Sequence, residues 1–340
     1  MQHLKAQSRH LDVIWRNEMQ LTLGPVLFDW KREDLFGFYD EVKDMPVDRV
    51  YLGEVVCSKK NGLTLKDIEN IGKKLEDADK KVIVSSLAVV SNEDELNLVR
   101  DIVQLPFSIE ANDMSAFNII NPPLPPFSKG GMGGFEIIAG PHITTYNVPS
   151  IQFLQGIGVN RVVFPVELSR DAIEYNIQNT NIDGEVFAHG KVPLAFSWRC
   201  YTSREYGLNK DDCKHHCRLH PDGMILRTIE KEPLFTINGT SILSGLVYTL
   251  VEFIEDLKEI DVKALRISPQ WQNTKDIVNI FRKRIDGEIS GEEGMTMLKQ
   301  TSQTGFCNGW YMGKAGKEYL AAPKKSICSV VAAASSLNIR

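Results

Sequence analysis

Short apolar runs rich in β-branched residues recur along the 340-residue chain at fairly regular intervals. Runs of this kind, with few polar positions inside them, are typical of β-strands that are covered on both faces. Between most of the runs, the apolar residues follow a helical spacing instead. The runs that we predict as strands are residues 20–27, 49–56, 81–90, 106–111, 135–140, 161–168, 184–190, 233–239 and 264–270.

Three intervening segments show the helical spacing clearly, because their apolar residues fall on one face. Thr64 with Asp67, and Ser91 with Asp94, look like helix-start boxes. Alternating strands and helices in about eight repeats predict a parallel sheet, and this number favours closure into a TIM-like (β/α) barrel. An open, doubly wound sheet is the alternative. The apolar helical faces are Leu35, Tyr39 and Val42, then Leu65, Ile68, Ile71 and Leu75, then Leu96, Val99 and Val103.

One segment interrupts this alternation. Residues 121–136, NPPLPPFSKGGMGGFE, combine several prolines and glycines between two predicted strands. Proline removes a hydrogen-bond donor and glycine is costly to order, so we predict a surface insertion. We expect an N-terminal extension over residues 1–18, a barrel domain over 19–311 that contains this insertion, and a C-terminal tail over 312–340.

Composition narrows the class of protein. A net charge of -5 without a dense basic patch gives no indication of a nucleic-acid surface. No stretch approaches the ~18 uninterrupted apolar residues that a membrane span needs, so we expect no stable membrane insertion. The N-terminus lacks the apolar centre of a secretory signal, so we expect a cytoplasmic protein. In that compartment six cysteines indicate metal or redox use rather than disulfides.

Three of these cysteines lie within one stretch, RCYTSREYGLNKDDCKHHC. Cys213 and Cys217 are four residues apart, and we expect them on one face of a short helix that ends near Pro221. Cys200 precedes them in a predicted loop. A tetrahedral metal site or a four-iron cluster needs a fourth ligand. Cys57 is the strongest candidate, because it ends an early strand and the carboxyl ends of barrel strands meet at one mouth.

The spacing bears on which metal these cysteines bind. Structural zinc sites are usually built from two close pairs, whereas here one distant cysteine precedes a C-x12-C-x3-C pattern. Four soft thiolates drawn from across a fold suit an iron–sulfur cluster better. Zinc and unliganded redox thiols remain open at this point. Cationic side chains flank the cysteines in the sequence. They would balance the charge of an anionic cluster and would also lower the pKa values of the thiols. These residues are Lys59, Lys60, Arg199, Lys214 and Arg218.

Other candidate residues have simpler explanations beside the functional one. We expect Cys307 and Cys328 to be buried as small hydrophobic residues. We expect the adjacent histidines His215 and His216 to face solvent rather than to bind zinc. The chain has no G-x-S-x-G, P-loop, G-x-G-x-x-G after a strand, or H-E-x-x-H motif. Several titratable residues lie near predicted strand ends, where a barrel places general bases and substrate contacts. A structural role is equally common at these positions. The residues are His142, His189, Glu54, Glu110 and Glu167.

A series of motifs, in order along residues 19–311, resembles the collagenase-like peptidase family. Within that family the motifs are most similar to accessory factors of oxygen-independent ubiquinone biosynthesis. The first eighteen residues, the 121–136 segment and the C-terminal tail depart from the pattern and remove no cysteine of interest. The motifs are LGPVLFDW, YLGEVVCSKK, FPVELSRD, HGKVPLAFSWRCYTSR, DDCKHHC, TINGTSILSGLVYTL, LRISPQ and CNGWY.

The resemblance implies a [4Fe-4S] cluster on Cys57, Cys200, Cys213 and Cys217. It also implies a heterodimer with a UbiU-like protein and a lipid-binding accessory protein of the ubiquinone pathway, with no nucleic acid involved. Such proteins together support hydroxylation of the ubiquinone ring without dioxygen, and prephenate is the proposed hydroxyl donor in the wider family.

Four thiolates would cap every iron of such a cluster, which suits electron transfer better than direct substrate binding. We therefore hypothesise that the subunit relays electrons or supports its partner, and we assign no catalytic residue. The alternatives are a peptidase of the same family, an RNA-hydroxylation factor, and a structural zinc protein.

Overall fold

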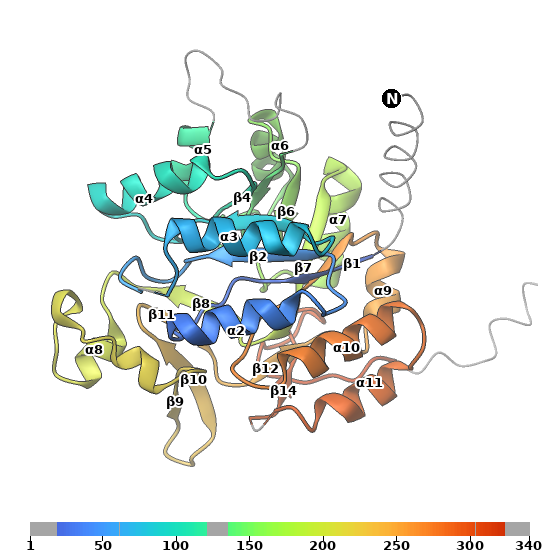
Figure 1. The fold of residues 1–340 in the computed structure, drawn as a ribbon. Helices are drawn as coiled ribbons and strands as arrows, with labels where there is room; N and C mark the ends of the chain where they lie inside the picture. Colours follow the sequence, from blue (N-terminus) through green and yellow to red (C-terminus); the bar gives the residue numbers. More distant parts are fainter. Residues whose placement is uncertain (1–18, 61, 121–134, 303, 324–340) are drawn as a thin grey trace, which may run out of the picture.

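The computed structural model describes residues 19–60, 62–120, 135–302 and 304–323 (Figure 1). The expected N-terminal extension, residues 121–134 of the expected insertion, and Cys328 lie outside the described residues. The boundaries of the extension, the insertion and the tail therefore stay predictions.

Parallel strands pair side by side and close into a barrel, because β7 pairs with β13 as well as with β6. This confirms the predicted TIM-like barrel, since an open sheet would leave two edges unpaired. The strands are buried along almost their whole length, as strands covered on both faces require. The eight barrel strands are β1 (Gln20–Leu23), β2 (Arg49–Gly53), β3 (Lys81–Ser85), β4 (Ser108–Ala111), β5 (Ile137–Ala139), β6 (Arg161–Val163), β7 (Asp183–Gly190) and β13 (Ala264–Ile267).

Helices between successive strands cover the outside of the barrel (Figure 1). Thr64 and Asp67 form the predicted capping box at the start of α3. The predicted Ser91–Asp94 box is wrong, because α4 begins one residue later and the Asn92 side chain accepts the N–H of Glu95 instead. The helices are α2 (Arg32–Val42), α3 (Leu65–Glu76), α4 (Glu93–Gln104), α5 (Met114–Ile120), α6 (Val148–Gly156), α7 (Arg170–Thr180), α9 (Ile254–Glu259), α10 (Thr274–Ile285) and α11 (Gly291–Leu298).

The predicted strand over 233–239 does not belong to the barrel. It forms β10 (Pro233–Asn238), which a tight turn at Gly239 (φ 63°) reverses into the antiparallel strand β11 (Ser241–Ser244). Two further strands, β8 (Pro193–Phe196) and β9 (Met224–Arg227), complete a four-stranded sheet in the order β8-β11-β10-β9. Apolar runs of this length do not distinguish a barrel strand from a hairpin strand, which explains the error.

The four-stranded sheet and the cysteine-rich stretch both lie in the segment between β7 and β13. Figure 1 shows this sheet and the short helix α8 (Tyr201–Glu205) grouped at one end of the barrel. Three hydrogen bonds attach the segment to loops that follow barrel strands. From the segment, Asn238 Nδ2 donates to the carbonyl of Leu27 (2.7 Å) and Thr240 Oγ1 donates to the carbonyl of Val56 (2.8 Å). In the opposite direction, Trp30 Nε1 donates to the carbonyl of Pro221 (2.7 Å).

Beside β7, two short strands extend the main sheet. β12 (Val247–Thr249) runs antiparallel to β7, and β14 (Phe306–Cys307) runs parallel to β12. Cys307 is buried there, as predicted for a small hydrophobic residue, and burial raises the pKa of its thiol to about 12.

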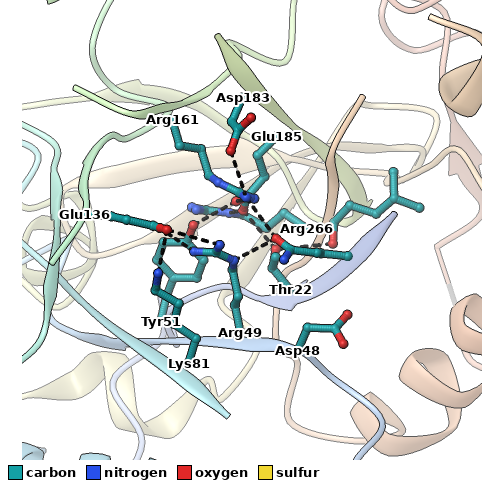
Figure 2. Close-up of polar contacts among 12 residues, drawn as sticks. Thr22, Asp48, Arg49, Tyr51, Lys81, Glu136, Arg161, Asp183, Glu185 and Arg266 are labelled. Atoms are coloured by element: carbon teal, nitrogen blue, oxygen red, sulfur yellow. Dashed lines mark hydrogen bonds and ion pairs between the residues drawn. The ribbon is translucent and has the colours of Figure 1, made fainter. Parts of the chain in front are cut away.

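The interior of the barrel holds a buried polar network beside a small apolar cluster, and Glu185 lies at the centre of this network (Figure 2). The hydroxyls of Thr22 and Tyr51 each donate to its carboxylate at 2.8 Å, and Arg266 Nε donates at 2.7 Å. Arg161 Nη1 lies 3.4 Å from Oε2 of the same carboxylate. These partners come from β1, β2, β13 and β6, so one carboxylate links four strands. Burial alone would raise the pKa of Glu185, but the two guanidinium groups outweigh it and lower that pKa to about 2.

A second ionic group lies at the amino-terminal end of the barrel, also visible in Figure 2. Arg49 Nη1 donates to Glu136 at 2.6 Å, and Lys81 pairs with the same carboxylate. Burial opposes ionisation of Glu136, but Arg49 and Lys81 lower its pKa to about 2. Gln20 joins this group to the central one, because its side-chain oxygen accepts from both Arg49 and Arg161.

We expect Glu185→Gln to lower the free energy of unfolding at pH 7 by about 3–5 kcal/mol, because it removes the buried carboxylate that Arg161 and Arg266 share. The lowered pKa of Glu185 means that its ionised form stabilises the fold above pH ~4.5. That contribution is lost as the pH falls from about 4.5 towards 2. Urea unfolding at several pH values should therefore show a weaker acid dependence in Glu185→Gln than in the wild type.

The matched control is Glu288→Gln, because Glu288 is exposed. Its free energy of unfolding should change by less than ~0.5 kcal/mol. Equal stability of the Glu185→Gln and wild-type proteins at pH 7 would contradict a central role for this carboxylate.

Candidate functional site

All four cysteines predicted as ligands line one pocket beside the carboxyl end of the barrel. The pocket encloses about 410 Å³, part of which is open to solvent. The structure thus brings together residues that the chain separates by as many as 160 positions. Its lining residues are Asp29, Cys57, Lys59, Lys60, Cys200, Thr202, Ser203, Lys210, Cys213, His215, His216, Cys217 and Gly239.

Three different loops supply the thiols. Cys57 lies four residues beyond the end of β2, in the β2–α3 loop, and not at the end of the strand itself. Cys200 is the residue before α8, and its sulfur accepts the backbone N–H of Ser203 at 3.3 Å. Hydrogen bonds to cysteine sulfurs are one of the means by which proteins tune a bound metal centre.

Cys213 and Cys217 do not share a helical face, so the predicted helix is wrong. Two short 3-10 segments, Lys210–Asp212 and His216–Leu219, stand in its place. Between them Lys214 and His215 both have left-handed φ values, 52° and 54°, which a right-handed helix cannot contain. The backbone of Cys213 has right-handed helical angles (φ -74°, ψ -15°). A right-handed residue followed by a left-handed one turns successive backbone N–H groups to one side, a conformation common at phosphate and iron–sulfur sites.

A buried carboxylate, Asp29, organises the floor of this pocket. The thiol of Cys217 donates to Asp29 Oδ2 at 3.0 Å, and Arg218 Nε donates to Oδ1 at 3.2 Å. His215 Nδ1 lies 3.4 Å from Oδ2. Burial and the contact with Asp29 raise the pKa of Cys217 well above its usual range, and burial also raises that of Cys57. The metal-free pocket therefore holds these two groups as thiols.

Lysines surround the same pocket. Lys60 is almost fully buried; its ammonium lies 2.9 Å from Glu54 and also donates to the carbonyl of Leu27. Lys59 pairs with Asp211 at 2.6 Å across the pocket entrance. Positive charges at this range would offset the negative charge of a thiolate-bound centre.

The arrangement of donors differs from that of a single-ion site. Within the described part of the chain, no three His, Cys, Asp or Glu side chains stand close enough together to hold one metal ion. The four cysteines line the same pocket, and four soft sulfur donors are the ligand set of an iron–sulfur cluster.

Comparison with protein families agrees with the fold and with the sequence motifs. The model of peptidase family U32 matches residues 40–321, which is most of the chain. The chain belongs to peptidase family U32.

Curated relatives of this U32 protein include RNA-hydroxylation proteins. It is 28% identical over 186 residues to a tRNA hydroxylation protein P of Helicobacter pylori, a match that covers 49% of this chain and 43% of the relative. It is 27% identical over 181 residues to a 23S rRNA 5-hydroxycytidine synthase of Escherichia coli, covering 51% of this chain and 26% of the relative. The matched part thus spans less than half the length of either relative.

Two further matches cover about three quarters of the chain. A collagenase of Porphyromonas gingivalis is 22% identical over 300 residues, covering 78% of this chain and 69% of the relative. A solved U32 peptidase structure superimposes with a TM-score of 0.42 at 9% identity, covering 74% of this chain and 94% of that one.

Among the described helices, none is both long and apolar enough to cross a membrane.

The expectation that His215 and His216 face solvent holds only in part, because both side chains are partly exposed and neither is fully so. Both are half-buried and line the cysteine pocket. His216 stacks on Tyr206 with ring centroids 4.2 Å apart, and the Tyr206 hydroxyl lies 2.9 Å from His220 Nε2. These rings therefore hold the cysteine loop against α8.

The remaining candidates lie in four different places. His142 and Glu110 line a second pocket at the barrel mouth, whereas Glu167 is exposed. Glu54 pairs with Lys60 beside the cysteine pocket. His189 lies between the barrel and the outer layer, against Phe281, so it is a core residue and not a general base at the mouth.

Sequence reasoning missed Asp29, Thr202 and Lys210, which also line the cysteine pocket. Asp29 had a detectable signal, because it follows the first predicted strand, and barrels place functional groups after strands. Lys210 and Thr202 had none, since the sequence does not reveal the path of the segment between β7 and β13 that carries them.

We expect Asp29→Asn to speed alkylation of Cys217 in the metal-free protein, because it removes the carboxylate that helps to raise the pKa of this thiol. Iodoacetamide labelling at pH 8, followed by peptide mass spectrometry, measures the rate at each cysteine. Cys307, remote from Asp29 in the fold, is the internal control. An unchanged rate at Cys217 would show that burial alone governs its reactivity.

Proposed function

We propose that this U32 protein is a UbiV-like accessory subunit of oxygen-independent ubiquinone biosynthesis. In this role it carries a [4Fe-4S] cluster on Cys57, Cys200, Cys213 and Cys217. The observation that carries the proposal is the single pocket that these four thiols line. The cluster, when bound, would supply one-electron chemistry.

The chain's own residues have definable roles in this proposal. The four cysteines would hold the cluster, and the N–H of Ser203 would donate to the sulfur of Cys200. Lys59 and Lys60 would offset the negative charge. The cysteine loop is anchored on Asp29 through Arg218 and on Trp30 through the carbonyl of Pro221, which would keep the site rigid.

Partners follow from the same proposal. A UbiU-like protein would form a heterodimer with this chain, and a lipid-binding accessory protein would present the quinone precursor. The hydroxylation itself would then be performed by the complex, with this subunit relaying electrons or supporting its partner.

RNA hydroxylation is the second candidate, because relatives over about half of the chain are named for it. A net charge of -5 favours it less, since RNA binding relies on basic surfaces. Peptidase activity is favoured least, although one relative is named a collagenase. Within the described residues neither His142 nor His189 hydrogen-bonds a serine or cysteine, the pairing that an activated nucleophile requires.

Protein purified without air should contain about four irons and four sulfides per chain. Cys57→Ala, Cys200→Ala, Cys213→Ala and Cys217→Ala should each lose the cluster, because a cubane with an uncapped iron is exposed to solvent and oxidation. Cys307→Ala and Cys328→Ala are the matched controls and should keep it. One zinc and no sulfide would instead indicate a structural metal site.

Deletion of the gene should lower ubiquinone in cells grown without oxygen and leave hydroxylated RNA nucleosides unchanged. Mass spectrometry of both pools from the same cultures makes the comparison. The wild-type gene should restore ubiquinone, whereas the Cys213→Ala variant should not. Loss of hydroxylated nucleosides at constant ubiquinone would favour the RNA alternative and contradict the proposal.

A further inference from the structure

The small antiparallel sheet has one face that is made almost entirely of apolar side chains. Residues opposite each other in neighbouring strands point to the same face of a sheet. One row on this face crosses all four strands, and the next row ends at Ser244 of β11. The outer face, as we define it here, consists of Ala195, Ile242, Ile237 and Met224 in the first row and Phe235 and Leu226 in the second.

This arrangement departs from the usual pattern of antiparallel sheets, which turn apolar side chains inward and polar ones outward. The inward face includes Thr236, Asn238 and Ser241, whose exposed fractions are only 0–2%. No side chain of the outer face is buried, and Leu226 is 48% exposed. A contiguous apolar surface in water is unfavourable, and in soluble proteins it marks a contact with another molecule.

The outer face is separate from the hydrophobic core of the barrel. Leu194 and Phe196, on the inward side of β8, pack against the main core. Among the described residues, the members of the outer face belong neither to this core nor to the side chains packed against it. The hairpin of β9 and β10 projects from the barrel instead (Figure 1). Its outer side is therefore accessible to a partner.

The tip of this hairpin is held by hydrogen bonds and adds a further apolar side chain. The N–H of Thr228 donates to the carbonyl of Glu232 at 2.9 Å, and the N–H of Lys231 donates to the carbonyl of Thr228 at 2.9 Å. Arg227 Nη1 also donates to the carbonyl of Lys231 at 2.9 Å. Ile229 lies within this turn and is 98% exposed. A turn that is already ordered loses little entropy when a partner binds.

The charges at the tip favour a protein partner over a lipid surface. Arg227 and Lys231 are positive, Glu230 and Glu232 are negative, and all four are exposed. Surfaces that bind membranes usually carry an excess of lysine and arginine beside their apolar part. The two signs are balanced at this tip, so it has no such excess. A protein surface that also carries both signs is the better match.

The same features make the outer face complementary to itself. It has no charged side chain, so two copies packed together bury no unpaired charge. The tip supplies both signs, so a twofold axis can place opposite charges together at the rim. Two sheets pack face to face about 10 Å apart, with the side chains of the facing surfaces interdigitated.

We propose that the outer face is the contact surface of a homodimer, in which the small sheets of two copies of this chain pack face to face. A standard interface takes roughly 800 Å² and 20–30 residues from each partner. The outer face and the hairpin tip supply fewer residues, so we expect a dissociation constant of about 10 µM. This inference goes beyond the proposed function, because it concerns this chain alone and requires no cluster.

Sedimentation velocity of the full chain, purified without air, at about 1–200 µM tests the inference. We expect the wild type to change from one chain to two over this range. Leu226→Lys places a charge in the contact and should raise the dissociation constant at least about tenfold. Leu226 is half exposed, so the variant should fold, which circular dichroism checks. Phe153→Lys, on the exposed surface of α6, is the matched control and should dimerise as the wild type does.

Hydrogen–deuterium exchange locates the contact. Wild-type peptides from β9 and β10 should exchange more slowly at about 200 µM than at about 1 µM, and those from α6 should not change. Leu226→Lys should lose this difference. Ile237→Thr keeps a β-branched residue but removes apolar surface, and it should weaken the dimer about threefold. It decides the question if Leu226→Lys fails to fold.

Four results would overturn the inference. They are a wild type that stays monomeric at about 200 µM, an unchanged dissociation constant in the folded variants, slower exchange in α6 instead of the hairpin, and a monomeric wild type that binds phosphatidylcholine vesicles through Leu226. The last result would assign the outer face to a lipid surface. Iron and sulfide are measured on the same samples, so an iron-free dimer contradicts only the cluster, and an iron-loaded monomer contradicts only the dimer.

Discussion

The carboxylate of Glu185, buried in the middle of the barrel, receives side chains from β1, β2, β6 and β13. Removing a charge from water is costly, and only the combined contacts of Arg161, Arg266 and two hydroxyls offset that cost. The closed arrangement of strands supplies those contacts together. The polar interior thus depends on closure of the barrel, and the same Arg266 extends the network to the mouth.

From that rigid barrel, the segment between β7 and β13 builds the cysteine pocket. Its small antiparallel sheet is attached to the loops after β1 and β2 through Asn238 and Thr240. These loops also carry Asp29 and Cys57, so the side chains that line the pocket are positioned by the barrel and not by the inserted segment alone. Sites supported in this way are held more precisely than sites on free loops.

The carboxyl end of the barrel carries two pockets with different linings. The cysteine pocket gathers soft donors, lysines and N–H groups, a set that suits an anionic metal centre. The mouth pocket combines Arg266, Glu110, Asn112 and His142 with apolar side chains. The loops after β1 and β2 contribute to both pockets, because Leu27 and Val55 line one and Asp29 and Cys57 line the other.

The strand and helix pattern by itself determined a parallel α/β architecture and favoured the barrel over an open sheet, since about eight buried runs with helices between them have few ways to bury both faces. Cysteine spacing and motif order indicated the four thiols. The sequence did not show that residues 233–238 form a hairpin strand, because short apolar runs look alike in either sheet. It also did not reveal the left-handed turn at Lys214 and His215, the carboxylate of Asp29 beneath Cys217, or the apolar outer face of the small sheet. Those features depend on which side chains meet across distant strands, and only the folded chain decides that.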